Sequence, residues 1–351
     1  METNIKKILE IAVLAPSGDN SQPWKFSIKD DTLYVILVRN ADDSAYNFME
    51  RGSLIGHGAV LENINIISRH LGLNANIQLF PEGKNSDLVA KISFLPTANQ
   101  DTGLFEAIEK RCTNRKQYKA LNISANHEKE ILSIPLEKPL LNFSLLKDRA
   151  KITDLANTIN LNERMFLENY YVHKGLFGFI RWTKEEELKY KTGMYIKTLE
   201  LQPPQEFAMK IFRRWPIINF FNKFNIAAMV AKDSAKLYTT SAAFGLITAP
   251  DLSEESLIAT GRMMQRIWLT ATKLGVSMQP TAGLLYLAQR VNEEGTKIFS
   301  AKHVEMLKTA EQKIKGIFKL SNEVPTLLFR LGYADPPSAT SIKHPYLLKN
   351  I

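Results

Sequence analysis

The sequence predicts an α+β fold with antiparallel or mixed sheets flanked by helices, built from two fused half-units that form an internal pseudo-dimer. Two observations lead to this fold class. Helical and strand-like periodicities alternate along the chain, which is typical of helices packed on sheets. Two helical stretches, 53–73 and 256–276, also repeat one another at an offset of 203 residues. A length of 351 residues accommodates two such halves.

The first half is interpreted as a helix, a hairpin, a second helix and a strand pair. Apolar residues recur at helical spacing up to Val13, and Pro16 and Gly18 then end the helix. Asp30 and Asp31 lie between two β-rich runs, as in a hairpin. The predicted elements are a helix over 5–13, a hairpin over 25–38, a helix over 53–73 and strands over 75–80 and 88–94.

The second half is more helical and contains one segment that periodicity does not explain. The predicted elements are helices over 104–111, 152–171 and 254–274 and a closing strand over 326–333. Residues 177–230 mix tryptophans, prolines and arginines with apolar runs, and we interpret them as a lid or insertion. The predicted halves are therefore 1–98 and 99–351, with the insertion inside the second half.

The repeat between the two long helices depends on seven identities. The identical pairs are Ser53/Ser256, Leu54/Leu257, Ile55/Ile258, Gly58/Gly261, Ile64/Ile267, Leu71/Leu274 and Gly72/Gly275. Two amphipathic helices that both end in Leu-Gly can also match by chance, and this alternative stays open at this point. If the repeat is genuine, two similar halves meet at one interface within a single chain, as two subunits do in a homodimer.

Composition and charge exclude several classes of protein. With 45% hydrophobic and 23% charged residues, the chain is neither a disordered tail, a collagen-like fibre nor a disulfide miniprotein. Cys112 is the single cysteine, so no internal disulfide can form and a reducing cytoplasm is the expected location. We expect neither a signal peptide nor a transmembrane span. The net charge of +9 fits a small phosphorylated ligand as well as a polyanion.

Two polar segments are candidates for binding chemistry. The loop 15–24, Ala-Pro-Ser-Gly-Asp-Asn-Ser-Gln-Pro-Trp, is dense in hydrogen-bonding side chains, although the same residues are common in ordinary turns. The segment 111–118, Arg-Cys-Thr-Asn-Arg-Lys-Gln-Tyr, places two guanidinium groups around a threonine. This pattern suits a phosphate. It equally suits the solvated C-terminus of a helix, and the residues alone leave both interpretations open.

Together with two further segments, these residues resemble the nitroreductase-like flavoprotein family and, within it, the single-chain branch that includes the mycobacterial Acg proteins. Residues 16–24 match the family's P-S-x-x-N-x-Q-P-W loop, and residues 111–115 are similar to its R-x-[ST]-x-R phosphate signature. The helix 261–275 and the strand 330–333 resemble the closing segments of that branch. Residues 177–230 have no counterpart in the resemblance.

The resemblance implies a bound FMN that is held by parts of both halves. The implied cofactor-binding residues are Ser17, Asn20, Gln22, Arg111, Thr113, Arg115, Pro280, Thr281 and Lys343. The segment 111–115 would hold the phosphate, the loop 17–22 would line the ribityl chain or the ring, and residues 280–281 would lie near the reactive ring edge. Lys343 stands where the family usually has an arginine, so this position lacks a bidentate fork.

The resemblance further implies an NAD(P)H-dependent flavin oxidoreductase. In such an enzyme the flavin accepts hydride at N5 from NADH or NADPH and reduces a small organic acceptor such as a quinone or nitroaromatic. Because the flavin carries this chemistry, no catalytic side chain is expected. No metal site is expected either, because the six histidines show no pair at ligand spacing. An internal pseudo-dimer would complete the site within one chain, so a monomer can suffice.

Two other functions remain as alternatives. The first is an FMN-sequestering or storage protein with little turnover, in which the insertion keeps the pocket shut. The second is a basic nucleic-acid-binding protein without a cofactor. That function needs basic residues clustered with stacking aromatic residues on one surface, and the sequence shows no such cluster outside the insertion. We expect small-molecule partners and no nucleic acid.

Overall fold

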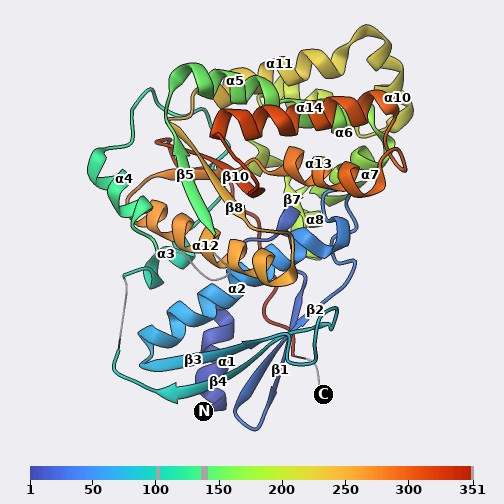
Figure 1. Cartoon of the computed structure of the whole chain (residues 1–351). Helices are drawn as coiled ribbons and strands as arrows, with labels where there is room; N and C mark the ends of the chain where they lie inside the picture. Colours follow the sequence, from blue (N-terminus) through green and yellow to red (C-terminus); the bar gives the residue numbers. More distant parts are fainter. Residues whose placement is uncertain (100–102, 136–140, 349–351) are drawn as a thin grey trace.

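The structure, a computed structural model of the chain, describes residues 1–99, 103–135 and 141–348. Within these residues it contains two four-stranded sheets, both antiparallel throughout. In Figure 1 one sheet lies at the bottom of the molecule and the other lies above it, with helices around both. The predicted α+β class with antiparallel sheets flanked by helices is therefore confirmed.

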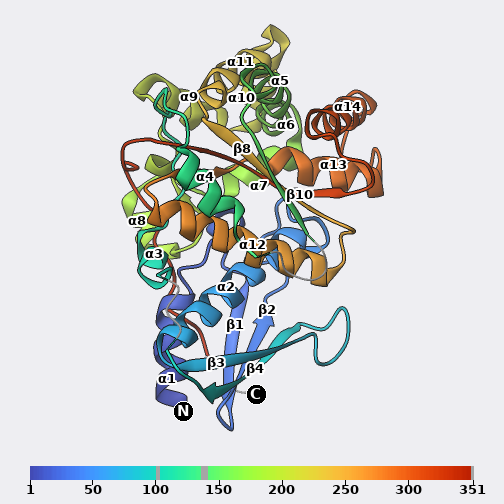
Figure 2. The same cartoon turned by 60° about the vertical axis from the view of Figure 1, so that its left-hand side comes forward.

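The first sheet has the strand order β1-β2-β4-β3. Its strands are β1 (Trp24–Lys29), β2 (Thr32–Leu37), β4 (Leu88–Pro96) and β3 (Leu73–Leu79). β1 and β2 form the predicted hairpin, in which Asp30 and Asp31 take positive φ angles of 49° and 56°, as a tight two-residue turn requires. The predicted helices are α1 (Glu2–Ala12) and α2 (Arg51–His70), which lie beside this sheet (Figure 2).

The second sheet has the strand order β5-β8-β10-β9. Its strands are β5 (Asn142–Leu146), β8 (Ala243–Ala249), β10 (Val324–Gly332) and β9 (Ser277–Pro280). α12 (Glu254–Lys273) covers one face of the sheet, and α13 (Gly283–Glu294) and α14 (Ala301–Phe318) cover the other (Figure 1). β10 confirms the predicted closing strand, and its residues from Pro325 to Gly332 are all buried because both faces are covered.

The remaining elements connect the sheets or build the upper part of the molecule in Figure 1. They are α3 (Phe105–Lys110), α4 (Ala125–Leu132), α5 (Arg149–Ile159), α6 (Leu161–Glu168), α7 (Tyr170–Phe179), β6 (Ile180–Arg181), α8 (Lys184–Tyr190), β7 (Met194–Tyr195), α9 (Pro203–Phe212), α10 (Trp215–Phe221) and α11 (Ile226–Thr239), with 3₁₀ turns η1 (Gly18–Asn20), η2 (Phe48–Glu50), η3 (Ile196–Leu199) and η4 (Asn222–Phe224).

The single helix predicted over 152–171 is wrong, because the chain forms α5, α6 and α7 there. Asn169 explains the second break. Its backbone is extended, and its side chain accepts hydrogen bonds from the backbone N–H groups of Tyr171 and Val172 at 3.0 and 3.1 Å. Such a side chain caps a new helix rather than continuing the old one. Apolar periodicity runs through the break and therefore conceals it.

The two repeated helices, α2 and α12, cross at their shared glycines. A Cβ atom on Gly58 would overlap the carbonyl oxygen of Ile258, and one on Gly261 would overlap that of Ile55. These are reciprocal contacts, since Ile55 and Ile258 are themselves one of the repeated pairs. The contact is therefore self-complementary, as at the interface of a twofold dimer. The internal pseudo-dimer predicted from the repeat is thus the arrangement that the chain adopts.

Polar contacts across this crossing follow the same reciprocity. Glu62 of α2 accepts a hydrogen bond from Arg266 of α12 at 2.6 Å. The positions related by the repeat are Asn63 and Gln265, and the Gln265 amide donates to the Asn63 oxygen at 2.7 Å. Both pairs are buried or half-buried. One pair is charged and the other neutral, so the two halves keep the backbone geometry while their side chains differ.

The C-terminal tail returns from the second sheet to the first. Beyond β10, the carbonyl oxygen of Leu347 accepts a hydrogen bond from the backbone N–H of Phe26 in β1 at 3.0 Å. The tail thereby binds the two halves together. The predicted boundary between residues 98 and 99 stays a prediction. None of the helices in the described part of the chain is long and apolar enough to cross a membrane.

Candidate functional site

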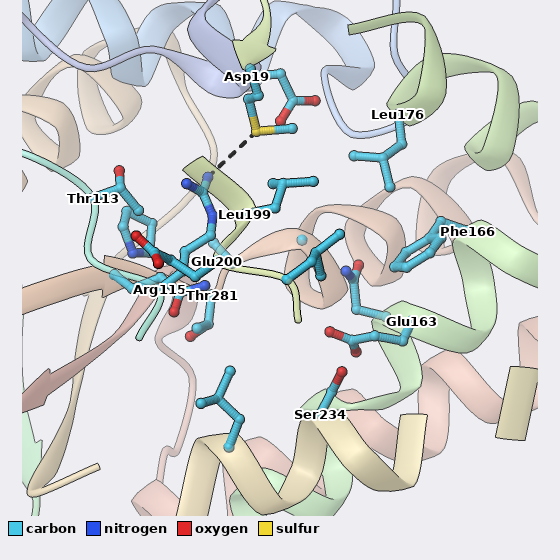
Figure 3. Close-up of a pocket in the computed structure, with 18 of the residues that line it drawn as sticks. Asp19, Thr113, Arg115, Glu163, Phe166, Leu176, Leu199, Glu200, Ser234 and Thr281 are labelled. Carbon is cyan, nitrogen blue, oxygen red and sulfur yellow. Dashed lines mark hydrogen bonds between the residues drawn. The ribbon is translucent and has the colours of Figure 1, made fainter. Parts of the chain in front are cut away.

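A cavity of about 1280 Å³ lies where the loop of the first half meets the second half. Residues from both candidate segments line it, namely Ser17, Asp19, Thr113 and Arg115, together with Thr281 after β9. Figure 3 shows Thr113, Arg115 and Thr281 on one side of the cavity and Glu163 with Phe166 on the other. The cavity exceeds the usual size of a small-molecule site. The structure thus brings the two motifs that the sequence singled out to one place.

The loop 17–22 is held in a tight, irregular conformation. Asp19, Asn20 and Gln22 have positive φ angles of 45°, 59° and 51°, which side chains other than glycine adopt only when contacts fix them. Ser17 supplies one such contact, because its hydroxyl accepts a hydrogen bond from the Gln22 N–H at 2.9 Å. This conformation presents Ser17 and Asp19 to the cavity.

Asn20 and Gln22 hold distant segments against the loop. The Asn20 amide donates to the carbonyl oxygens of Gly193 at 3.1 Å and Ile342 at 2.9 Å. The Gln22 amide donates to the carbonyl of Lys191 at 2.7 Å and accepts from the N–H of His344 at 2.8 Å. Neither residue lines the cavity. Both position the insertion and the tail, and their predicted contact with a ligand stays a prediction.

The cationic segment after α3 sends its two arginines to different neighbours. Arg115 lines the cavity, where it donates to the carbonyl of Thr198 at 3.1 Å and to the sulfur of Met194 at 3.4 Å (dashed line in Figure 3). Arg111 instead stacks on the Trp268 ring at 4.5 Å and donates to the carbonyl of Leu14 at 3.0 Å. Arg111 therefore joins the two halves next to the cavity without lining it.

Four cations lie around this segment and form no ion pair with a carboxylate in the described part of the chain. Arg330 is buried, and Arg111, Arg115 and Lys343 are half-buried. Burial lowers the pKa of Arg111 to about 10 and also lowers the pKa values of Arg115 and Arg330. Burial, with the charge of Arg111, lowers the pKa of Lys343 well below its usual value. No ion pair within the described ranges involves any of the four. Buried charge without compensation is costly, and the arrangement is typical of a site that binds an anion.

Arg330 is a site residue that sequence reasoning missed. It is fully buried in β10, where its guanidinium stacks on the Tyr118 ring at 3.9 Å. It donates to the side-chain oxygen of Gln279 and to the carbonyl of Lys116, both at 2.7 Å. Gln279 and Lys116 line the cavity, so Arg330 positions its wall from behind. The sequence signal that could have identified it is an arginine within an otherwise apolar strand.

Two carboxyl groups of the cavity have strongly raised pKa values. Burial, followed by the charge of Asp42, raises the pKa of Asp19 to about 7, against the opposing effect of Arg115. Burial also raises the pKa of Glu163 to about 7. Glu163 accepts a hydrogen bond from the Tyr238 hydroxyl at 2.9 Å. Both groups therefore carry a proton for much of the time near neutral pH.

Pro280 and Thr281 form the wall where β9 leads into α13. The backbone N–H of Thr281 donates to the carbonyl of Leu328 at 2.8 Å, which fixes this corner. The Thr281 hydroxyl is buried and has no hydrogen-bond partner among the described residues. Lys343 lies outside the cavity lining and donates to the carbonyl of Ala15 at 2.8 Å. Of the nine predicted residues, the cavity lining includes Ser17, Thr113, Arg115, Pro280 and Thr281.

The insertion supplies a large part of the cavity wall. Its lining side chains are mostly apolar and include Ile180, Ile196, Leu199, Met209, Phe212 and Val230. An apolar wall excludes water and strengthens electrostatic interactions inside the cavity. The described residues hold no cluster of three or more histidine, cysteine or carboxylate side chains that could bind a metal ion.

Comparisons with known proteins give distant relatives. No model of a known protein family matches the chain. An uncharacterized protein of Mycobacterium tuberculosis is 22% identical over 95% of this chain, which spans 46% of that relative's length. The probable NAD(P)H nitroreductase PigM of a Serratia species is 21% identical over 86% of this chain and 88% of its own length. The chain thus spans less than half of the first of these relatives.

Another relative is more similar over a shorter stretch. The putative NAD(P)H nitroreductase acg of Mycobacterium tuberculosis is 34% identical over 92 residues, 26% of this chain and 28% of the relative. Among solved structures, a nitroreductase with bound FMN from Bacteroides fragilis aligns with 69% of this chain and 94% of its own at 12% identity and a TM-score of 0.37. The sequence relatives show that the chain is similar to nitroreductase-like proteins. They confirm the resemblance to the Acg branch that the motifs predicted.

Proposed function

We propose that this chain binds FMN in the cavity between its halves and is an NAD(P)H-dependent oxidoreductase that reduces a small organic acceptor such as a quinone or nitroaromatic. The observation that carries the proposal is the group of cations beside the loop 17–22 that form no ion pair among the described residues, of which Arg115 lines the cavity. The names of the relatives acg and PigM, both NAD(P)H nitroreductases, support it. A monomer that acts in the cytoplasm, without nucleic acid, is part of the same proposal.

The cationic side of the cavity fits the phosphate of FMN. Arg115 forms no ion pair in the described part of the chain, and Arg111 keeps a buried Nε without a hydrogen-bond partner. A phosphate dianion in the cavity would form charge-assisted hydrogen bonds with Arg115, and Arg111 next to the cavity would attract it through its charge. Thr113 lines the same side and adds a hydroxyl donor. Because Asp19 and Glu163 are partly protonated near neutral pH, they repel such an anion less than full carboxylates would.

The other predicted residues fit the remainder of the cofactor. Thr281 offers a buried hydroxyl without a partner, next to Pro280. Ser17 lies on the opposite half and closes the same cavity. When bound there, FMN supplies the hydride and electron chemistry. The protein's part is to bind and orient it, and the apolar side chains of the insertion exclude water from it.

An FMN store with little turnover is the second candidate. It is favoured by the wall that the insertion builds, since Met209, Phe212 and Val230 cover the cavity on the side away from the sheets. If this cover stays shut, a large acceptor does not reach the ligand. Both candidates require FMN, and they differ in turnover.

FMN binding is tested first. We expect purified protein to be yellow and to release FMN on denaturation. Arg115→Ala removes charge-assisted hydrogen bonds worth about 1.5–3 kcal/mol each, so FMN affinity should fall roughly 10- to 150-fold. Arg39→Ala is the matched control, because Arg39 is exposed and pairs with Asp87 at 2.6 Å. A colourless protein that gains no flavin on addition of FMN contradicts both candidates.

Turnover then separates the enzyme from the store. Anaerobic mixing with NADPH or NADH should bleach the flavin absorbance within seconds if the protein is a reductase. Steady-state rates with a panel of quinones and nitroaromatics should then show multiple turnovers. A bound flavin that resists both nucleotides, and stays bound through the assay, supports the store.

A further inference from the structure

The outer face of the insertion carries exposed aromatic side chains. Phe207, Phe220, Phe221, Phe224 and Met229 are 67%, 54%, 39%, 63% and 61% exposed, and we call them the aromatic tip. Every exposed phenylalanine in the described ranges belongs to it. Figures 1 and 2 place its helices α10 and α11 at the end of the molecule opposite the first sheet. Isolated exposed apolar residues are ordinary, but a contiguous group marks an interaction surface.

Three rings of the aromatic tip, those of Phe220, Phe221 and Phe224, lie together. The Phe220 ring is 5.8 Å from the Phe221 ring and 5.8 Å from the Phe224 ring, in both cases edge to face. Trp215 of α10 lies 5.6 Å from Tyr170 of α7, which is itself 46% exposed. An exposed aromatic ring of α7 thus packs against α10, the helix that carries Phe220 and Phe221.

Positive charge surrounds these rings. Residues 207–232 contain the five basic residues Lys210, Arg213, Arg214, Lys223 and Lys232 and no acidic residue. Lys210 pairs with Glu206, and Arg213 lies over the Trp182 ring. No ion pair among the described residues involves Arg214, Lys223 or Lys232. Lys223 lies over the Phe220 ring at 5.8 Å and keeps its charge, and Arg214 and Lys232 remain for an external partner.

Helices α9 and α11 of the insertion also contribute side chains to the cavity wall. Ala208, Met209 and Phe212 of α9 and Val230 of α11 line the cavity. A small hollow of about 280 Å³ contains Phe207 and Lys210 and shares Lys197, Leu201 and Glu206 with the cavity lining. The outward aromatic residues are therefore not required to close the cavity, and they lie beside it.

We propose that the aromatic tip docks this protein onto the surface of an anionic phospholipid bilayer. Phenylalanine and methionine side chains enter the interfacial zone of a bilayer, while lysine and arginine bind anionic headgroups. The helices lie on the membrane rather than crossing it, which agrees with their length and with Pro216 in α10. The inference concerns a surface outside the proposed FMN site and does not depend on flavin binding.

Two other occupants fit the surface less well. A second copy of the chain would bring two basic surfaces of the same sign together at a self-complementary contact. Single-stranded nucleic acid stacks on separate, accessible ring faces, whereas Phe220, Phe221 and Phe224 pack against one another. The lipid surface matches both the charge and the clustered apolar side chains.

The test is sedimentation with lipid vesicles. The full-length protein is mixed with vesicles of phosphatidylcholine alone or with an equal share of phosphatidylglycerol, at low and high salt. We expect binding to the anionic vesicles, weaker binding at high salt, and little binding to neutral vesicles. Absence of binding to the anionic vesicles at low salt would overturn the proposal.

Two variants separate the apolar and the charged contributions. Phe220→Ser with Phe224→Ser should weaken binding on the order of 100-fold, because two largely exposed rings no longer enter the bilayer. Phe221 is left in place because its ring packs on Phe212 at 5.9 Å. Arg214→Glu with Lys223→Glu should weaken binding at least 25-fold, at about fivefold for each charge removed. Circular dichroism is used to check that each variant remains folded.

The matched control changes apolar residues that are equally exposed elsewhere. Leu95→Ser with Leu132→Ser alters residues that are 59% and 45% exposed, and vesicle binding should not change. Equal losses in the control and in the phenylalanine variant would overturn the proposal. So would a stable dimer that the phenylalanine variant dissolves, or binding to a single-stranded oligonucleotide that exceeds binding to anionic vesicles.

Discussion

Two regions of the molecule, the α2–α12 interface and the cavity, differ in whether their charged side chains form ion pairs. At the interface, the Glu62 side chain is 1% exposed and receives hydrogen bonds from Arg262 at 3.0 Å and Arg266 at 2.6 Å. In the cavity, neither Arg115 nor Glu163 forms an ion pair with another described residue. The two regions are adjacent, since Met264 and Trp268 of α12 also line the cavity.

This difference separates residues that stabilise the fold from residues that we propose bind a ligand. Burying a charge costs free energy unless a partner of opposite sign compensates it. The interface meets that condition internally. The cavity meets it only in part, since the Asp19 carboxyl and Arg115 interact without forming an ion pair. Such groups in a concave site are a physical indication of function. Substitutions in the two regions should therefore change stability in opposite directions.

The largest effect is expected where the two helices touch. Gly58→Ala places a methyl group against the Ile258 carbonyl and 2.8 Å from the Gly261 Cα. Backbone atoms of a helix cannot move aside cheaply, so the free energy of unfolding should fall by about 3 kcal/mol or more. Gly261→Ala should have the same effect, because its contacts are the reciprocal ones. Urea unfolding followed by circular dichroism measures both.

A matched glycine outside the interface serves as the control. Gly316 lies within α14, and nothing lies within 4 Å of a Cβ built on it. Gly316→Ala should raise the free energy of unfolding by about 0.5–1 kcal/mol, since alanine favours a helix more than glycine does. If Gly58→Ala and Gly316→Ala lose similar amounts of unfolding free energy, the helix crossing does not explain the loss in Gly58→Ala.

The charged contact of the interface comes next. Glu62→Gln leaves Arg262 and Arg266 without their shared carboxylate and should cost about 2–3 kcal/mol, less than a fully buried pair because both arginines reach solvent. The related neutral contact, broken by Gln265→Met, should cost about 1 kcal/mol. Thermal unfolding of both variants at one pH tests the order. A larger loss in Gln265→Met would contradict it.

The carboxyl group of the cavity should respond in the opposite direction. Between pH 4.5, the ordinary value for a glutamic acid, and about 7, folded Glu163 keeps a proton that the unfolded chain has lost. Stability due to this group therefore falls as the pH rises through that window. Glu163→Gln removes this dependence and should be more stable than the natural protein at pH 8, on the order of 2 kcal/mol.

The pH profile itself distinguishes this cause from a simple packing change. The gain of Glu163→Gln should become small near pH 4.5, where both folded proteins are neutral at this position and Glu163 of the unfolded chain is only half ionised. Unfolding by urea at pH 4.5, 6 and 8 measures it. A gain or loss that is the same at all three pH values would show that Glu163 is ionised throughout or that the glutamine repacks the cavity.

Local patterns explain which parts of the fold were predictable. The helix ends at Gly72 and Gly275 both have a φ of 69°, so the Leu-Gly repeat in the sequence corresponds to the same cap twice. The hairpin at Asp30 and Asp31 depends on neighbours only. By contrast, the break at Asn169 depends on one side chain, and apolar periodicity conceals it.

Long-range contacts explain what the sequence did not predict at the site. Arg330 reaches Gln279 and Lys116, which are 51 and 214 positions away. Asn20 binds backbone groups 173 and 322 positions away. Composition indicated that these residues can form hydrogen bonds, but not with which partners. The two motifs were found because a family resemblance joined them, and the structure shows that one cavity contains residues of both.

The smallest effect is expected when two buried threonines are each replaced by valine. Thr260 in α12 donates to the Ser256 carbonyl at 2.8 Å and to Thr326 at 3.1 Å. The Thr281 hydroxyl in the cavity wall has no partner among the described residues. Because valine replaces the hydroxyl by a methyl of similar size, Thr260→Val should lose about 1 kcal/mol of unfolding free energy, whereas Thr281→Val should be neutral or gain a similar amount. If FMN binds as proposed, Thr281→Val should weaken FMN binding despite that gain in stability. If Thr281→Val instead loses stability in the absence of FMN, the hydroxyl serves the fold and not the ligand.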